Sequence, residues 1–367
     1  MRSSATVLSM GKVFRSIVFC LIASGLSSIA IASKLCLYVA VAGEERIAVY
    51  RQVKDTGKVV FESDIEVDGG PRALMVSRDG RFLFASLSES GKIASFGIDG
   101  QNGSLRFLSE TVAGSHASFL HLDQSERFLI SSYYFEGHVI IHAVEDGVLG
   151  ETALQTIETA DRPHSVEIDK SNRFVFVPHT AANGIFQFKF DSSEGTIASN
   201  EVAVLNREGV AGPRHFRLAA NGLFGYGSDE QGNSVTVYRL DSENGRLETL
   251  QTLSTLPNDF EGKNSTSDVG IHPSGRFVYV ANRGHDSLAA FLVDSESGEL
   301  SPVDRFACEA ATRSFEFSPD GRFLYAAGSG SGKFAAYRVN EDNGALVRFQ
   351  TLEIGEDPWA MAIVETQ

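Results

Sequence analysis

Short runs of alternating apolar and polar residues, separated by turn residues, fill the chain from about residue 35 to its C-terminus. One stretch contains four of them: Val269–His272, Phe277–Ala281, Ser287–Val293 and Leu300–Ala307. Their period of two and their content of β-branched and aromatic residues predict β-strands. No run keeps the 3.6-residue period of an amphipathic helix, which excludes a helical solenoid.

A polar turn that ends in Arg-Phe, or a close variant of it, recurs along the chain. A second polar turn, which ends in Gly-x-Leu or a variant, lies between most copies of the first. Four predicted strands in each unit of about 45 residues are typical of a propeller blade. The phenylalanines of the first turn are Phe82, Phe128, Phe174, Phe224, Phe277 and Phe323.

The two ends of this repeat region complement each other. Its beginning has only three strands, Leu37–Ala42, Ile47–Gln52 and Val60–Val67, whereas Trp359–Val364 at its end has no partners of its own. We expect the last run to complete the first blade as its innermost strand, because closure removes exposed sheet edges. The prediction is therefore an all-β, seven-bladed β-propeller with four antiparallel strands per blade, in one domain over residues 33–367.

The first 32 residues follow a different pattern. Basic residues come first, and a largely apolar run follows over residues 17–32, ending in Ala30-Ile31-Ala32. This pattern predicts a signal peptide over residues 1–32 that is cleaved after Ala32. The run is short and rich in serine for a membrane anchor, and no lipobox-like cluster precedes Cys20. We expect an exported protein, periplasmic or secreted.

Composition and charge exclude several classes of protein. The net charge of −15 becomes −18 when the signal peptide, with three basic and no acidic residues, is removed. This charge excludes a non-specific nucleic-acid binder. Three cysteines are too few for a disulfide scaffold or a thiolate zinc module, although a bridge between Cys36 and Cys308 stays open. No metal-binding spacing of histidines is present, and we expect neither a metal nor another cofactor.

Polar residues gather at one face of the predicted ring. In a propeller the innermost strand begins at the face to which the loop between the second and third strands returns, so each blade contributes two segments there. Functional residues usually lie on such loops. The segments of this face are Ser115-His116, Tyr133-Tyr134-Phe135, Pro163-His164-Ser165, His179-Thr180, Pro213-Arg214-His215, Asp229-Glu230-Gln231, Asn282-Arg283-Gly284-His285-Asp286 and Ala311-Thr312-Arg313.

Arginine and histidine that converge at one face predict a positive pocket in an acidic protein, suited to a carboxylate or phosphate. Glu230 is a candidate general base, or a residue that holds an arginine in position. Structural interpretations stay open beside these. His116 and His164 are also candidates for hydrogen-bonded core residues, and Glu230 for an ion pair with Arg214 or Arg283.

Other candidates fit structural roles better. The pair His285-Asp286 is interpreted as a turn stabiliser rather than a catalytic dyad, because aspartate often closes loops through its own backbone. His138, His142 and His272 lie away from the polar face and are interpreted as structural. No nucleophile-elbow sequence supports a Ser-His-Asp triad.

Three segments resemble the signature segments of the lactonase family of seven-bladed propellers. This family includes bacterial propeller-type 6-phosphogluconolactonases and fungal carboxy-cis,cis-muconate cyclases. The resemblance spans the chain after the signal peptide, although Gly225-Tyr226-Gly227-Ser228-Asp229 departs from the family's pattern. The segments are Pro163-His164-Ser165-Val166, Gly212-Pro213-Arg214-His215-Phe216 and Val280-Ala281-Asn282-Arg283-Gly284-His285-Asp286-Ser287.

The resemblance implies an active site made of His164, Arg214, Glu230 and Arg283. We expect substrate contacts from the nearby residues His116, Tyr134, His215, His285 and Arg313. The leading interpretation is a 6-phosphogluconolactonase-type hydrolase that acts on an anionic lactone or sugar acid. The alternatives are a muconate-type lactonising isomerase and a non-catalytic exported propeller that binds a protein or carbohydrate. We expect a monomer without nucleic-acid or membrane partners.

Overall fold

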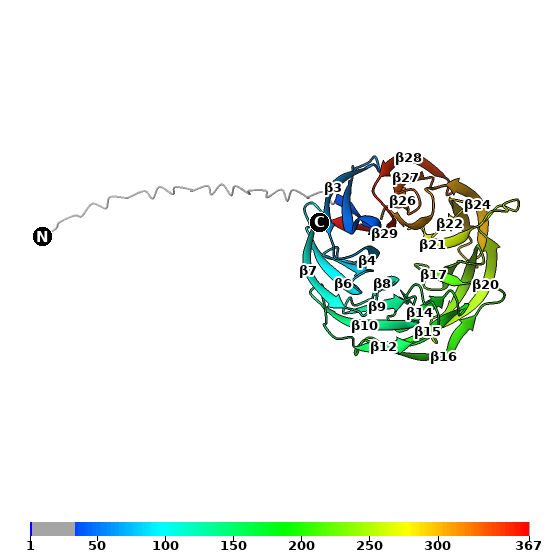
Figure 1. The fold of residues 1–367 in the computed structure, drawn as a ribbon, viewed down its shortest axis with the longest axis horizontal. Helices are drawn as coiled ribbons and strands as arrows, with labels where there is room; N and C mark the ends of the chain where they lie inside the picture. Colours follow the sequence, from blue (N-terminus) through cyan, green and yellow to red (C-terminus); the bar gives the residue numbers. More distant parts are fainter. Residues whose placement is uncertain (2–33, 367) are drawn as a thin grey trace. The chain divides into compact units, whose positions relative to one another are not determined.

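The computed structural model describes residues 34–366, together with Met1. Apart from Met1, the predicted signal peptide, residues 1–32, lies outside the described residues. Between residues 34 and 366 the chain forms seven antiparallel sheets arranged as a ring (Figure 1). This architecture confirms the all-β, seven-bladed propeller. In the same range the strands are joined by turns and one short 3-10 helix, η1 (Ala42–Glu44), and no helix is long and apolar enough to cross a membrane.

The first four blades contain the following strands, given from the channel outward. Blade one has β29 (Pro358–Thr366), β1 (Lys34–Val41), β2 (Arg46–Gln52) and β3 (Val59–Glu66). Blade two has β4 (Pro71–Val76), β5 (Phe82–Leu87), β6 (Lys92–Ile98) and β7 (Leu105–Val112). Blade three has β8 (Phe119–Leu122), β9 (Phe128–Tyr133), β10 (His138–Glu145) and an outer strand divided into β11 (Val148–Leu149) and β12 (Gln155–Glu158). Blade four has β13 (Glu167–Ile168), β14 (Phe174–His179), β15 (Gly184–Asp191) and β16 (Thr196–Asn206).

The last three blades follow the same order. Blade five has β17 (Pro213–Leu218), β18 (Phe224–Asp229), β19 (Ser234–Asp241) and β20 (Arg246–Ser254). Blade six has β21 (Ser265–Ile271), β22 (Phe277–Arg283), β23 (Ser287–Val293) and β24 (Leu300–Ala307). Blade seven has β25 (Thr312–Phe317), β26 (Phe323–Gly328), β27 (Lys333–Val339) and β28 (Leu346–Glu353).

The ring closes between the two ends of the described chain. Strand β29 pairs antiparallel with β1, from Lys34 opposite Thr366 to Val41 opposite Pro358. The C-terminal strand thus completes the first blade as its innermost strand, as predicted. Closure gives blade one its fourth strand and joins the two ends of the described chain in one sheet, which holds the ring together.

The two repeated turns interlock neighbouring blades. Phe174 of blade four is buried, and the arginine before it lies over its ring, with Cζ 5.0 Å from the ring centroid. Gly245, in the outer turn of blade five, packs against the same ring with a φ of +64°. A side chain at residue 245 would strike the ring and strain the backbone. The repeated arginines and many of the glycines therefore belong to the scaffold.

The two described cysteines, Cys36 and Cys308, are not joined by a disulfide. Cys36 is buried in β1 and Cys308 follows β24, and both are free thiols. His272 places Nε2 2.8 Å from the carbonyl oxygen of Gly321 in the next blade. That inter-blade contact confirms a structural role for His272.

Candidate active site

A β-bulge marks the start of the innermost strand in several blades. In blade five, β17 pairs with β18 through Pro213 opposite Asp229 and then His215 opposite Ser228, so Arg214 is an extra residue. The same irregularity leaves one extra residue in blades one, two and seven. Because a bulge re-aims the side chain of its extra residue, position 214 faces the channel although the regular alternation would turn it away.

Matching the other blades through their pairing with the second strand gives one residue per blade at this position. We call these seven residues the mouth ring. In blade order they are Trp359, Arg72, Ser118, His164, Arg214, Ser267 and Arg313. The scaffold repeats the position, whereas the side chain differs from blade to blade.

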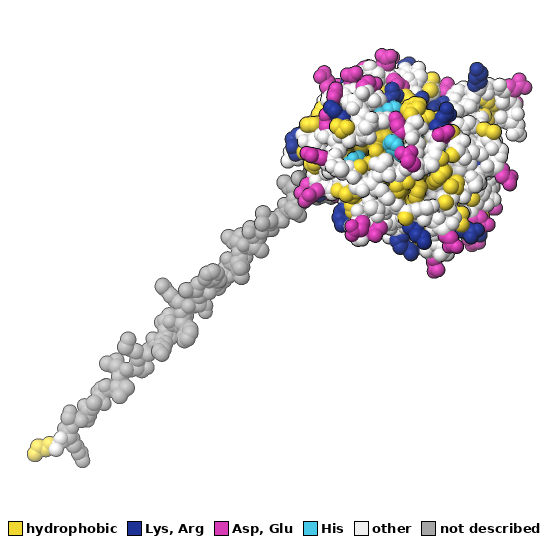
Figure 2. All heavy atoms as spheres, turned by 60° about the horizontal axis from the view of Figure 1, so that its bottom comes forward, with side chains coloured by type: hydrophobic (Ala, Val, Ile, Leu, Met, Phe, Trp, Pro, Cys, Tyr) yellow, Lys and Arg dark blue, Asp and Glu magenta, His cyan; other side chains and the backbone are white. Residues whose placement is uncertain are grey.

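A cavity of about 520 Å³, here called the mouth cavity, opens over this ring. Histidine side chains lie among hydrophobic and charged ones on the face that Figure 2 presents. Phe135 and Trp359 add apolar surface to the lining. The lining also contains four guanidinium groups and two carboxylates, from Arg72, Arg214, Arg283, Arg313, Glu89 and Glu230. The structure thus brings together the four residues that the family resemblance implies, in a cationic cavity of an acidic protein.

Glu230 joins two of the arginines. Its Oε1 accepts a hydrogen bond from Nη2 of Arg283 at 3.0 Å, and its Oε2 lies 3.5 Å from Nε of Arg214. Arg283 also donates to the carbonyl oxygen of Thr266 at 3.0 Å. The ion-pair interpretation of Glu230 is therefore correct as geometry, and the carboxylate fixes both guanidinium forks toward the cavity.

Arg214 keeps hydrogen-bonding capacity for a ligand. Its side chain is 3% exposed, and its Nη1 has no hydrogen-bond acceptor among residues 34–366. Burial, together with the charge of Arg283, lowers the pKa of Arg214, yet a guanidinium stays protonated in proteins. A buried charged donor without an acceptor is costly, so the site favours an oxyanion at this point.

His164 places a neutral imidazole in the cavity. Burial, reinforced by the charges of Arg214 and of the other arginines, lowers the pKa of His164 well below its usual range. Its Nδ1 is buried and has no partner among the described residues. The ring of Tyr134 lies edge-on to the imidazole, with centroids 5.7 Å apart. A neutral imidazole has one ring nitrogen whose lone pair accepts a hydrogen bond.

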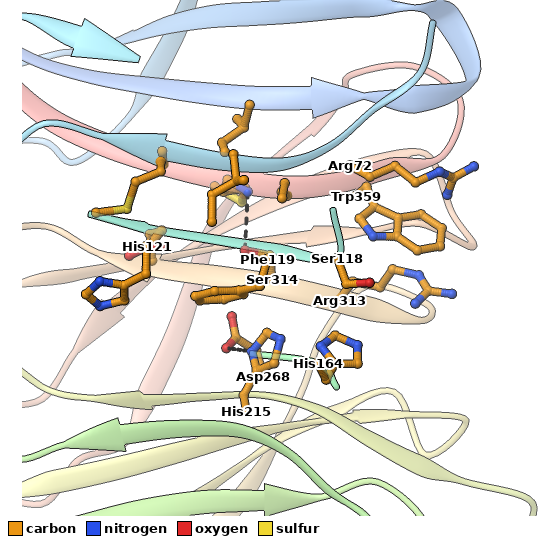
Figure 3. Close-up of a pocket in the computed structure, with 18 of the residues that line it drawn as sticks. Arg72, Ser118, Phe119, His121, His164, His215, Asp268, Arg313, Ser314 and Trp359 are labelled. Atoms are coloured by element: carbon orange, nitrogen blue, oxygen red, sulfur yellow. Dashed lines mark hydrogen bonds and ion pairs between the residues drawn. The ribbon is translucent and has the colours of Figure 1, made fainter. Parts of the chain in front are cut away.

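The remaining predicted residues divide into three groups. His116 and Tyr134 line the mouth cavity with Arg313. His215 lies deeper, in a second cavity of about 430 Å³ that continues down the channel, and its Nδ1 is 2.6 Å from Oδ1 of Asp268 (Figure 3). His285 lines neither cavity, since its Nδ1 is 2.7 Å from the hydroxyl of Ser287.

The turn interpretation of Asp286 is confirmed, because its carboxylate accepts backbone hydrogen bonds from Gly284 and Ala311. Arg72 and Trp359, by contrast, are mouth-ring residues that are not among the predicted ones. A signal for them exists in the sequence: a proline precedes residues 72, 164, 214 and 359 alike. Within residues 34–366, no three His, Cys, Asp or Glu side chains come together as a metal site needs.

The fold and the cavity define a class: a seven-bladed β-propeller with a cationic cavity at the mouth of its channel. The sequence profile described as "Lactonase, 7-bladed beta-propeller" matches residues 21–121 and 89–361. The chain belongs to this family, which confirms the resemblance in the sequence.

Individual relatives agree with the family. A 6-phosphogluconolactonase of Klebsiella pneumoniae (strain 342) is 29% identical over 273 residues, covering 74% of this chain and 81% of the relative. The structure of the periplasmic gluconolactonase of Pseudomonas aeruginosa superposes with a TM-score of 0.84 at 27% identity, covering 91% of this chain and 99% of that chain. A Lactobacillus plantarum protein at 20% identity, with a TM-score of 0.83 and covering 91% of this chain and 100% of its own, shares the fold.

Proposed function

We propose that this protein hydrolyses the lactone of a sugar acid in the mouth cavity, as a 6-phosphogluconolactonase-type enzyme. Membership of the lactonase family supports this proposal, and so do the names of two relatives, a 6-phosphogluconolactonase and a periplasmic gluconolactonase. Both names describe the opening of a sugar-acid lactone. The chemistry of the cavity adds independent support.

One observation carries the proposal: a neutral imidazole and a buried guanidinium N–H, each without a hydrogen-bond partner within residues 34–366, line the same cavity. These are Nδ1 of His164 and Nη1 of Arg214. Lactone hydrolysis needs a base for water and a donor for the carbonyl oxygen, which gains negative charge in the transition state. A purely structural arrangement would pair both groups within the protein.

The proposed reaction has two steps. A water oxygen attacks the lactone carbonyl carbon while His164 accepts a proton from that water, and the carbonyl oxygen gains negative charge beside Arg214 and Arg283. The bond from that carbon to the ring oxygen then breaks, and His164 returns the proton to the departing oxygen. The product is the open-chain hydroxy acid, and no other reactant is consumed.

Glu230 acts in this scheme as a positioning residue. One of its carboxylate oxygens accepts a hydrogen bond from Arg283, and the other forms an ion pair with Arg214. Preorganised donors stabilise a developing charge without having to reorient during the reaction. Removing this carboxylate therefore weakens transition-state stabilisation without removing the base.

The decisive test is a hydrolysis assay of the purified protein without residues 1–32, on a panel of sugar-acid lactones in a pH-stat, above the spontaneous rate. We expect at least one lactone to be opened, and expect the double variant His164→Gln/Arg214→Met to be inactive while its thermal unfolding stays cooperative. The absence of turnover with every lactone would contradict the proposal, and so would full activity of the double variant.

We also propose that residues 1–32 direct export and are removed after Ala32. The basic start and the apolar run that ends in Ala30-Ile31-Ala32 support this, as does a structural relative described as periplasmic. N-terminal sequencing of the protein from cell fractions tests it. We expect the extracytoplasmic form to begin at Ser33, and an intact N-terminus confined to the cytosol would contradict it.

A further inference from the structure

Three mouth-ring side chains form a stack at the ring closure: Arg313 from blade seven, Trp359 from blade one and Arg72 from blade two. Cζ of Arg313 lies 3.7 Å from the indole centroid, and Cζ of Arg72 lies 4.0 Å from it. Figure 3 shows the indole between the two arginine side chains. The stack follows from the bulge, which aims the same position of three successive blades into the channel.

The positive charge of this stack is poorly compensated. Arg72 forms one ion pair, with Asp357 at 3.7 Å. Arg313 forms no ion pair or side-chain hydrogen bond within the described part of the chain, and its Nε is buried without an acceptor there. Two carboxylates act on Arg313 from a distance. Asp357 is paired with Arg72. Glu230 is paired with Arg283 and Arg214. The indole face attracts both cations, but it supplies no hydrogen-bond acceptor.

A purely structural stack has a different form in this protein. Arg322 lies over the ring of Phe323, with Cζ 5.3 Å from the centroid, at the outer turn of blade seven. There the guanidinium is 43% exposed and is paired with Asp320 at 2.6 Å. The scaffold thus gives a stacked arginine both water and a carboxylate. Arg313, on the same blade, is only partly exposed and has no carboxylate partner within residues 34–366.

We propose that Arg72, Trp359 and Arg313 form a subsite for an anionic group, a phosphate or a carboxylate, that the substrate carries at the end remote from its lactone ring. This inference rests on the proposed function and narrows it to lactones with a second, negatively charged end. Stacking on the indole fixes each guanidinium plane, so that its N–H edges remain free for an oxyanion. Trp359 holds the two forks at the channel wall, across the ring from Arg214.

Intrinsic tryptophan fluorescence follows this subsite directly, because Trp359 is the one tryptophan of the chain. We would titrate the protein with gluconate, 6-phosphogluconate and glucarate and follow the intrinsic fluorescence. The last two carry a second anionic group, phosphate and carboxylate respectively. We expect both, or the one that the subsite selects, to change the emission at a concentration at least about 10-fold lower than gluconate. Equal half-saturation by all three would overturn the proposal.

Kinetics of Arg72→Met and Arg313→Met provide the second test, on glucono-1,5-lactone, its 6-phosphate and glucaro-1,4-lactone. We expect KM for the preferred anionic lactone to rise about 10- to 100-fold, as for the loss of a charged hydrogen bond, with kcat changed far less. KM for the neutral lactone should rise by less than about 3-fold. The control is Arg239→Met, which removes an exposed arginine paired with Glu248 on the outer surface.

The two proposals fail in different ways. If the wild-type protein opens no lactone, the proposed function is wrong, but the fluorescence titration needs no turnover and still decides the subsite. If lactones are opened and both arginine variants treat charged and neutral lactones alike, the subsite is wrong and the function stands. Circular dichroism and melting temperatures of the variants separate either result from misfolding.

Discussion

The channel has two levels that share the same seven strands but differ in how their charges are arranged. The mouth ring contains three arginines, one histidine and no carboxylate. The lower ring lies three residues further along each innermost strand. In blade order the lower ring is Ala362, Met75, His121, Glu167, Arg217, Gly270 and Glu316. It contains one arginine and two glutamates.

The lower ring is compensated within itself. Glu167 lies 3.8 Å from Nη1 of Arg217 and 3.7 Å from Nε2 of His121. At the mouth, by contrast, Arg214 and Arg313 keep buried nitrogens without acceptors among residues 34–366. The same seven strands form both levels, and the lower level shows that they accommodate compensated charges, so the scaffold does not require the unpaired cations of the mouth. The comparison supports an anion-binding role for the mouth ring and a structural role for the lower ring.

The largest effect should come from the base at the mouth. Replacing His164 by Gln removes the proton acceptor, and we expect kcat/KM to fall about 10²- to 10⁴-fold. In the wild type, kcat/KM should stay level as the pH falls through 6.5, because the lowered pKa of His164 keeps the imidazole neutral there. It should then fall at lower pH, as the imidazole takes up a proton. A pH–rate profile with its acidic limb near pH 6.5 would contradict this assignment.

Arg214 and Arg217 lie on the same strand, β17, but at different levels of the channel. Arg214→Met removes the buried donor at the mouth, and we expect kcat/KM to fall about 10²- to 10³-fold, as for the loss of an oxyanion donor. Arg217→Met, three residues further along β17, removes the same charge from the lower ring and should cost less than about 3-fold. Both are measured by lactone hydrolysis with folding checked by circular dichroism. Equal losses would show that net charge, rather than position, matters.

A smaller effect is expected for the residue that positions the arginines. Glu230→Gln keeps the shape and one acceptor, so we expect a loss of about 10- to 100-fold in kcat/KM, consistent with weakened charge-assisted hydrogen bonds. The acidic limb of the pH profile should survive in this variant, because His164 remains the base. Disappearance of that limb in Glu230→Gln would identify Glu230 as the base instead.

The architecture can be predicted from the sequence because almost every blade forms from consecutive residues, so turn motifs and period-two strands repeat at a near-constant spacing. Closure by Trp359–Val364 follows from the strand that the first blade lacks. The resemblance of sequence segments to the lactonase family also points to His164, Arg214, Glu230 and Arg283, which line the mouth cavity together. The sequence does not predict which polar atoms stay unpaired, because the contact of Glu230 with Arg283 joins different blades. Gly225, where the family pattern is broken, is explained only by the fold, since a side chain there would strike Phe216.

Substitutions in the lower ring should change the stability of the protein rather than its catalysis. Burial, with the nearby Asp268 carboxylate, raises the pKa of Glu316 to about 8. An unfolded glutamate ionises near about pH 4.3, so between that pH and 8 unfolding releases a proton from Glu316. The free energy of unfolding therefore falls as pH rises through this window.

Glu316→Gln should remove this loss of unfolding free energy at higher pH. Because the side chain is only partly buried against the channel, we expect the variant's gain in melting temperature to grow by about 2–4 °C between pH 5 and pH 8. The matched control is Glu353→Gln, at a side chain that is 87% exposed, which should change nothing between the two pH values. An equal gain at pH 5 and pH 8 would mean that Glu316 is ionised in the folded protein, and that the lower ring holds an uncompensated charge as the mouth does.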